Sequence, residues 1–129
     1  MLILGLVLAV LAALLHVFIF YLESLAWTSG RARAIFGTTA EGATATRELA
    51  FNQGFYNLFL AVLALLGVIV TAAGSAAVGL TLTLAGTGCM SAAALVLLIS
   101  SPAKASAALK QLAFPALAVI ALVIAILLG

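Results

Sequence analysis

Charged side chains are nearly absent from this chain of 129 residues, which has five Lys or Arg and three acidic residues. Soluble domains usually contain about 25% charged residues, whereas 67% of this chain is apolar. Such a small number of polar side chains cannot cover a water-facing surface. A soluble globular domain is therefore excluded. The net charge of +2 is too small, and its carriers too scattered, for a nucleic-acid partner.

Cysteine and histidine occur once each, as Cys89 and His16. One cysteine excludes an intrachain disulfide, and one Cys with one His cannot build a usual zinc site within one chain. We therefore expect no metal, and no motif points to another cofactor. Cys89 lies in an apolar run, where we expect a small buried packing residue rather than a reactive thiol.

Long hydrophobic runs are abundant. A helix that crosses the ~30 Å hydrocarbon core needs about 20 apolar residues. The first run exceeds the roughly 7–15 apolar residues of a signal-peptide core and has no basic start, so we expect a retained helix. The sequence predicts one all-α domain over residues 1–129, a transmembrane four-helix bundle with up-down-up-down topology. The predicted spans are residues 2–27, 47–73, 76–100 and 102–128.

All basic residues lie in or beside the first and third connections between these spans. By the positive-inside rule these connections are cytoplasmic, and both termini lie on the non-cytoplasmic side. We expect a multi-pass protein of the cytoplasmic (inner) membrane, with the lipid bilayer as its partner. The basic residues are Arg31, Arg33, Arg47, Lys104 and Lys110.

Local signals mark the ends of several helices. Residues 29–37 predict one or two helical turns in the membrane interface that end at Gly37, with an irregular basic loop as the alternative. Thr38 and Glu41 match a capping box, so the second long helix is expected to begin near Thr39. Ser101 as N-cap and Pro102 at the first helical position predict the start of the fourth.

Small residues recur every four positions along the third span. This spacing puts them on one side of a helix, as in membrane helices whose backbones approach closely. We interpret the stripe as a packing surface rather than a ligand path. Its members are Ser75, Gly79, Thr83, Thr87 and Ser91.

The second span begins with an unusually polar stretch, residues 48–57, in which five of ten side chains are strong hydrogen-bonding groups. Such groups are costly in hydrocarbon unless a partner satisfies them. The first span offers partners at matching depth if Trp27 and Arg47 share the cytoplasmic interface. At 1.5 Å per residue, Glu23 is then ~6 Å inside the membrane and His16 ~16 Å inside. The expected neighbours are Glu23 with Phe51 and Asn52, Tyr21 with Gln53, and His16 with Asn57.

The helical faces agree in part with this alignment, because His16, Phe20, Glu23 and Trp27 form one stripe of the first helix. Gly54 leaves a gap in the second helix where another backbone or a ligand can approach. Intramembrane ionisable groups mark a functional site by default. We therefore predict a ligand-binding polar layer made of His16, Tyr21, Glu23, Asn52, Gln53, Tyr56 and Asn57.

These side chains also have a purely structural interpretation. In it, Glu23 pairs with Arg47 or Arg31 and locks the hairpin, the amides hold helices together, and His16 is a packing histidine. One carboxylate, one imidazole, two phenols and three amides nevertheless exceed what a four-helix bundle needs for stability.

Several of these motifs together resemble domain-of-unknown-function family 1304, a family of small bacterial integral membrane proteins. The resemblance covers nearly the whole chain and implies a four-helix membrane protein, but it brings no biochemical activity. The chain departs from the family pattern at Ser24-Leu25-Ala26, where bulkier residues are usual. The motifs are residues 16–23 with Trp27, residues 31–37, residues 52–57, Gly88-Cys89, and Gln111 with Pro115.

Three functions remain open. The favoured one is binding or transport of a small molecule or proton through a polar pocket between the first two spans, with a homo-oligomer as the expected form of a carrier. The second is a membrane-embedded enzyme for a lipophilic substrate, with Glu23 or His16 as acid–base group. The third is a non-catalytic partner subunit. Because almost nothing polar follows Leu58 in the second span, a simple pore is disfavoured.

Overall fold

The computed structural model describes residues 1–129 and is entirely helical. Four helical segments are long and apolar enough to cross a membrane, which confirms the predicted class. Two short helices, α2 and α3, lie between the first two long ones. The elements are α1 (Leu2–Phe20) with η1 (Tyr21–Leu25), α2 (Gly30–Phe36), α3 (Ala40–Ala45), α4 (Arg47–Ala72), α5 (Ala76–Ser100), and η2 (Pro102–Lys104) with α6 (Ala105–Leu127).

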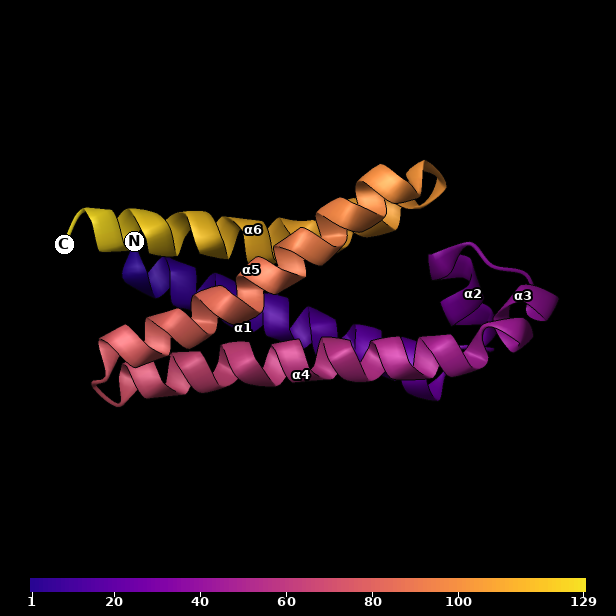
Figure 1. The fold of residues 1–129 in the computed structure, drawn as a ribbon, viewed down its shortest axis with the longest axis horizontal. Coiled ribbons are helices and arrows are strands. Elements are labelled where there is room, and N and C mark those ends of the chain that lie inside the picture. Colours follow the sequence, from indigo (N-terminus) through magenta and orange to yellow (C-terminus); the bar gives the residue numbers. More distant parts are fainter.

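The four long helices form a ring in which each packs mainly against two others. Helix α1 contacts α4 and α6, and α5 contacts the same two helices from the opposite side. Both chain termini lie at one end of the molecule, and α2 and α3 lie at the other end (Figure 1). The polar first turns of α4 therefore share an end with η1 and the start of α6.

Small residues fill the interior, and large apolar side chains face outward. The central cluster comprises Ala12, Ala13, Ala61, Ala64 and Met90, all fully buried. Ile3, Phe59 and Ile99 are among the many large side chains that are exposed. This distribution suits a lipid solvent, in which helices gain from close packing rather than from burying large apolar groups.

The small stripe of α5 lies in the contact with α4, which confirms its packing interpretation. Gly67 of α4 faces Gly79 and Thr83 of α5 so closely that an added Cβ would overlap Thr83. Thr83 and Thr87 are fully buried. Their hydroxyls donate to carbonyls one turn earlier in α5, Thr83 to Gly79 over 2.9 Å and Thr87 to Thr83 over 2.7 Å. These hydroxyls are satisfied within their own helix and need no ligand.

The expectation that Cys89 is buried is wrong, because this thiol is exposed. A helix turns about 100° per residue, so Cys89 lies about 200° around α5 from Thr87. It therefore points away from the face that packs on α4. Glycine and threonine occupy the contact instead.

Residues in the first connection form α2, so the helical interpretation of residues 29–37 is confirmed over the irregular loop. Ser29 Oγ accepts from the Ala32 amide over 3.1 Å. Gly37 ends the helix in the left-handed conformation, with φ 64°, which glycine adopts without steric cost.

Two other cap expectations need correction. Thr39, not Thr38, is the N-cap residue, because its hydroxyl accepts from the Gly42 amide over 3.0 Å. The helix that it begins is the separate α3, which ends before α4 starts at Arg47. Ser101 precedes Pro102 as expected, but its side chain makes no capping bond and Pro102 opens the 3-10 turn η2.

Candidate polar cavity

Glu23 and Asn57 connect the end of the first span to α4. Asn57 Nδ2 donates to Glu23 Oε2 over 2.8 Å and to the Gln53 carbonyl over 3.2 Å. Both hydrogens of the amide nitrogen are therefore used, and the carboxylate accepts a hydrogen bond inside the bundle. Buried charge is tolerated in a membrane where such a partner is present.

The expected register placed Glu23 beside Phe51 and Asn52, whereas its partner is Asn57. Backbone contacts lie close to the expected level, since Ser24 Oγ donates to the Phe51 carbonyl over 2.8 Å. Helical side chains lean toward the N-terminus of their own helix. In antiparallel helices Glu23 therefore leans toward the bundle centre and Asn57 toward the α2–α3 end, so the two side chains meet.

Glu23 lies in η1, a π-helical turn that the sequence analysis did not anticipate. The Ala26 amide donates to the Tyr21 carbonyl, five residues earlier, over 3.0 Å. A π turn holds more residues than an α turn and often occurs at functional sites. It changes the angular positions of the residues after Phe20 relative to those before it. His16 and Glu23 are both buried, while Glu23 and Trp27 line the cavity described below and His16 does not.

Gly54 permits the close approach of η1 to α4. A Cβ at this position would overlap Ser24 Oγ and would lie 3.0 Å from the Ser24 amide nitrogen and 3.1 Å from the Phe20 carbonyl oxygen. The gap at Gly54 was expected to admit either another backbone or a ligand. In the structure, the backbone at Phe20 and Ser24 occupies it. This contact brings the Glu23 turn against α4.

A cavity of about 300 Å³ adjoins the Glu23–Asn57 bond, at the end of the bundle that holds α2 and α3. Its walls come from η1, α4, α5, η2 and α6, with Leu60, Ala93 and Leu97 as apolar parts. Its polar lining comprises Glu23, Gln53, Tyr56, Asn57, Lys104 and Gln111.

Aromatic side chains also line the cavity. Trp27 packs against Phe36 of α2 with ring centroids 5.1 Å apart, and both line the space. Trp27 Nε1 donates to Thr46 Oγ1 over 3.1 Å, so the indole is held to the residue before α4. These contacts of Trp27 with Phe36 and Thr46 hold the first connection beside the cavity.

The charged groups of the cavity are one carboxylate and one ammonium group. No cation lies within 4.0 Å of a carboxylate, so neither Arg31 nor Arg47 pairs with Glu23. Arg31 instead lies over the Phe18 ring, 5.4 Å from its centroid. Glu23 Oε2 is bonded to Asn57, while Oε1 has no hydrogen-bond donor from the protein.

Four of the seven predicted site residues line the cavity, namely Glu23, Gln53, Tyr56 and Asn57. The other three do not. Tyr21 is 49% exposed and stacks on Phe18, and Asn52 is exposed on the surface of α4. His16 is fully buried outside the cavity lining.

The hydrogen bond of His16 fixes its neutral tautomer. Nδ1 lies 2.8 Å from the Ala12 carbonyl oxygen, and a carbonyl can only accept, so Nδ1 carries the hydrogen. Nε2 is then an acceptor in the neutral ring, and it is buried without a hydrogen-bond partner.

The structure has no cluster of three or more His, Cys, Asp or Glu that could hold a metal ion.

Two cavity residues were missed by the sequence analysis. In the sequence, Lys104 served only to orient the chain by the positive-inside rule, and Gln111 only as part of the family motif. The available signal was their spacing of seven residues in the fourth span, which places both on one face of a helix. Lys104 stands at the start of α6 and Gln111 two turns later.

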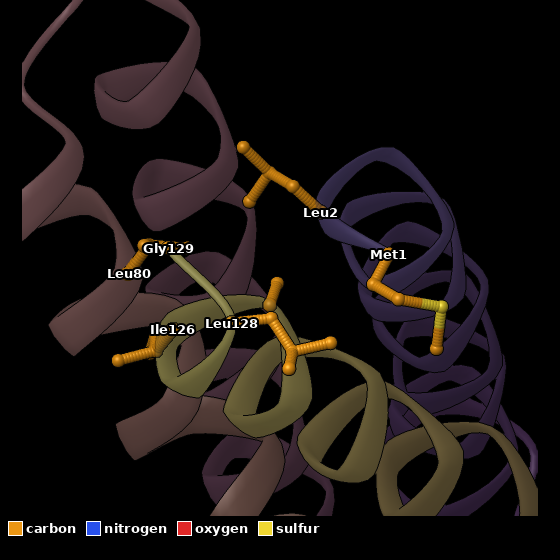
Figure 2. A pocket seen from close by; sticks show the side chains of 7 residues that line it. Met1, Leu2, Leu80, Ile126, Leu128 and Gly129 are labelled. Carbon is orange, nitrogen blue, oxygen red and sulfur yellow. The ribbon is translucent and has the colours of Figure 1, made fainter.

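A second cavity, of about 490 Å³, lies at the opposite end of the bundle, between the start of α1 and the end of α6. Figure 2 shows Leu2, Ile126 and Leu128 around it. Its lining includes no titratable side chain and almost no polar one. This second cavity therefore offers no side chain for chemistry that needs charged or hydrogen-bonding groups.

Comparison with known proteins gives one informative match. No curated protein and no solved structure matches the chain. The model of the family described as "Protein of unknown function (DUF1304)" matches residues 10–123. This range includes η1, α4 and the cavity residues of α6. The chain therefore belongs to the DUF1304 family of proteins of unknown function.

Proposed function

We propose that this protein is an integral protein of the cytoplasmic membrane that binds a small polar molecule in the cavity beside Glu23. One observation carries the proposal. A carboxylate, an ammonium group, three carboxamides and a phenol line a single space of about 300 Å³ between helices that are mostly apolar. Polar groups in a membrane protein are costly and are concentrated at ligand and ion sites.

The size and charge of the cavity define the class of ligand. Its volume is at the lower end of the roughly 300–1,000 Å³ of small-molecule sites, so the ligand has few heavy atoms. Glu23 Oε1 is free to accept a hydrogen bond and Lys104 is free to donate one, while Gln53 and Gln111 can do both. The opposite charges of Glu23 and Lys104 favour a zwitterionic or neutral molecule over a strongly charged one.

The ligand reaches the cavity from one side of the membrane. The positive-inside rule makes the end with α2 and α3 cytoplasmic, with up-down-up-down spans and both termini outside. Toward the other side, the path is filled by the packed core around Ala12, Ala61 and Met90. This supports a binding site, or the inward-facing state of a carrier, over an open pore. The cavity is complete in one chain, so the proposal does not depend on a homo-oligomer.

The enzyme hypothesis receives less support from the geometry. That hypothesis takes Glu23 or His16 as its acid–base group, and His16 does not line the cavity, which leaves Glu23 alone for this role. The partner-subunit hypothesis requires no ligand. The ligand titration described next therefore distinguishes it from the binding hypothesis.

Fluorescence of Trp27 tests the proposal directly, because this is the only tryptophan in the chain and it lines the cavity. The purified protein in nanodiscs is titrated with small amines, carboxylates, zwitterionic amino acids and neutral amides of similar size. We expect a saturable change in emission for at least one zwitterionic or neutral compound. Glu23→Gln should weaken the response to amine-bearing compounds, and Lys104→Gln the response to carboxylates.

Arg47→Gln is the matched control, because it removes a charge at the same end of the bundle but outside the cavity. Access is checked independently with Gln111→Cys in a Cys89→Ala background. A water-soluble thiol reagent should label it from the cytoplasmic side only. A cavity that is closed to the reagent from both sides would contradict the proposal and favour a structural subunit.

A further inference from the structure

Two further hollows lie between α1, α2 and α6, and Phe36 lines both of them as well as the polar cavity. The outer one, of about 410 Å³, is formed by the end of α2 and the start of α6. The inner one, of about 190 Å³, lies between α1, α2 and α6. They share Ile35, Phe36, Ala107 and Lys110, so they form one continuous groove.

The outer hollow is basic. Lys104, Lys110 and Ser106 line it, and no acidic residue lines either hollow. Both lysines are exposed, and neither forms an ion pair within 4.0 Å. The three carboxylates of the chain lie in η1, α3 and α4. An anion between the two lysines would therefore meet no carboxylate in the groove, while Lys104 also lines the polar cavity together with Glu23.

The inner hollow is apolar along α1. Leu15, Phe18, Ile19 and Leu22 form its wall, and Lys110 and Gln111 contribute its polar atoms. Leu15 precedes the end of the first span by ten residues, which is roughly 15 Å along a helix. The groove thus leads from a basic outer chamber along an apolar wall toward the centre of the bundle. A small hydrophilic anion would use only the basic chamber. A lipid has a head group for the basic chamber and an acyl chain for the apolar wall.

We propose that one anionic lipid occupies this groove, with its phosphate between Lys104 and Lys110 and an acyl chain along Leu15, Phe18 and Leu22. Basic pockets between membrane helices on the cytoplasmic side are a known way of holding acidic head groups. The charge match between two unpaired lysines and an anionic head group selects this occupant over a neutral lipid. Which leaflet supplies the lipid depends on the proposed orientation of the chain. The position of the lipid site in the fold does not depend on it.

The test compares phosphatidylglycerol with phosphatidylcholine of the same acyl chains, added to the purified full-length protein in a neutral detergent. Bound lipid is counted by native mass spectrometry and thermal unfolding is followed in parallel. We expect phosphatidylglycerol to remain bound and raise the Tm, and phosphatidylcholine to do neither. Lys110→Gln should weaken phosphatidylglycerol binding about fivefold, as expected for one lysine near an anionic head group.

Lys110 is the informative position because, unlike Lys104, it does not line the polar cavity beside Glu23. Arg47→Gln removes an equal charge from an exposed position outside the groove and should leave lipid binding unchanged. Ala107→Phe fills the junction of the two hollows and should reduce binding with both lysines present. The helix content of Ala107→Phe in detergent shows whether this variant folds. If it does not fold, Ile35→Ser, on the exposed surface of α2, takes its place in the binding assay.

Other outcomes would overturn the proposal. Equal stabilisation by inorganic phosphate would make the lysines a site for a free anion, and equal binding of phosphatidylcholine would make the groove an unselective lipid contact. Phosphatidylglycerol with a photoreactive acyl chain should cross-link to residues 15–22 of wild type and of Glu23→Gln. Cross-links elsewhere would place the lipid outside the groove, whatever the result of the ligand titration at Trp27.

Discussion

Asn57 of α4 donates to Glu23 of η1 over 2.8 Å, across a separation of 34 residues in sequence. This bond joins the π turn of the first span to the most polar part of the second. It also leaves the other carboxylate oxygen of Glu23 unbonded beside the cavity. The same contact can thus stabilise the bundle and present an acceptor to a ligand.

Replacement of Asn57 by alanine should destabilise the protein. Glu23 would then remain buried without its hydrogen-bond donor, and a buried group left unsatisfied costs about 1–3 kcal/mol. Denaturant unfolding in mixed micelles measures the loss. Asn52→Ala is the matched control, because Asn52 is exposed and has no side-chain hydrogen bond, so we expect a change within about 0.5 kcal/mol. Equal losses at the two positions would contradict the role of the Asn57 bond.

Two glycine substitutions should have opposite effects. A Cβ at Gly67 would overlap Thr83 and lie 2.6 Å from the Gly79 carbonyl oxygen, whereas one at Gly88 would meet nothing within 4 Å. We expect Gly67→Ala to cost about 1–3 kcal/mol through overpacking and Gly88→Ala to gain roughly 0.5–1 kcal/mol through reduced backbone freedom. The unfolding assay used for Asn57 compares them. A neutral Gly67→Ala would mean that α4 and α5 can separate without cost.

The helices and the small-residue packing face of α5 could be predicted because they depend on local patterns, whereas the partner of that face, α4, was not predicted. Length and apolarity alone identify a membrane span, and the spacing of Gly79, Thr83 and Thr87 alone identifies a small-residue face. Contact between the polar parts of the first two spans followed from their similar depth, but the expected neighbours did not, since Glu23 bonds to Asn57. The helices and the small-residue face need no knowledge of how distant segments align, whereas the contact between polar segments rests on an assumed alignment of Trp27 with Arg47.

The cavity could be predicted only in part, because its shape depends on tertiary register. The π turn around Glu23 comes with the contact of Ser24 with Phe51 and Gly54, which no local pattern in residues 21–25 reveals. Lys104 and Gln111 join the cavity through the packing of α6 against α1 and α5. His16 was assigned to the layer from its helical stripe and from its expected depth beside Asn57, but the side-chain partner of Asn57 is Glu23.

The orientation of the chain can be tested with a reporter at the C-terminus. Because every basic residue lies in or beside the first and third connections, we expect both termini on the non-cytoplasmic side. A phosphatase that matures only outside the cytoplasm should be active when it is fused after Gly129. A green fluorescent protein fused at the same position should be dark if its export prevents folding. Strong cytoplasmic fluorescence would reverse the assignment.

His16 provides the last prediction, because its Nε2 is buried and has no partner while Nδ1 donates to the Ala12 carbonyl. An unsatisfied buried acceptor costs about 1–3 kcal/mol, and leucine can fill similar space without one. His16→Leu should therefore be as stable as the wild type or more stable. His16→Ala is the control for volume and should lose about 2–5 kcal/mol, the range for emptying a large buried site. Since the chain has one histidine, ¹⁵N NMR of labelled protein reports its tautomer without assignment and should show the hydrogen on Nδ1. A large loss in His16→Leu together with a hydrogen on Nε2 would mean that the imidazole has another partner inside the bundle.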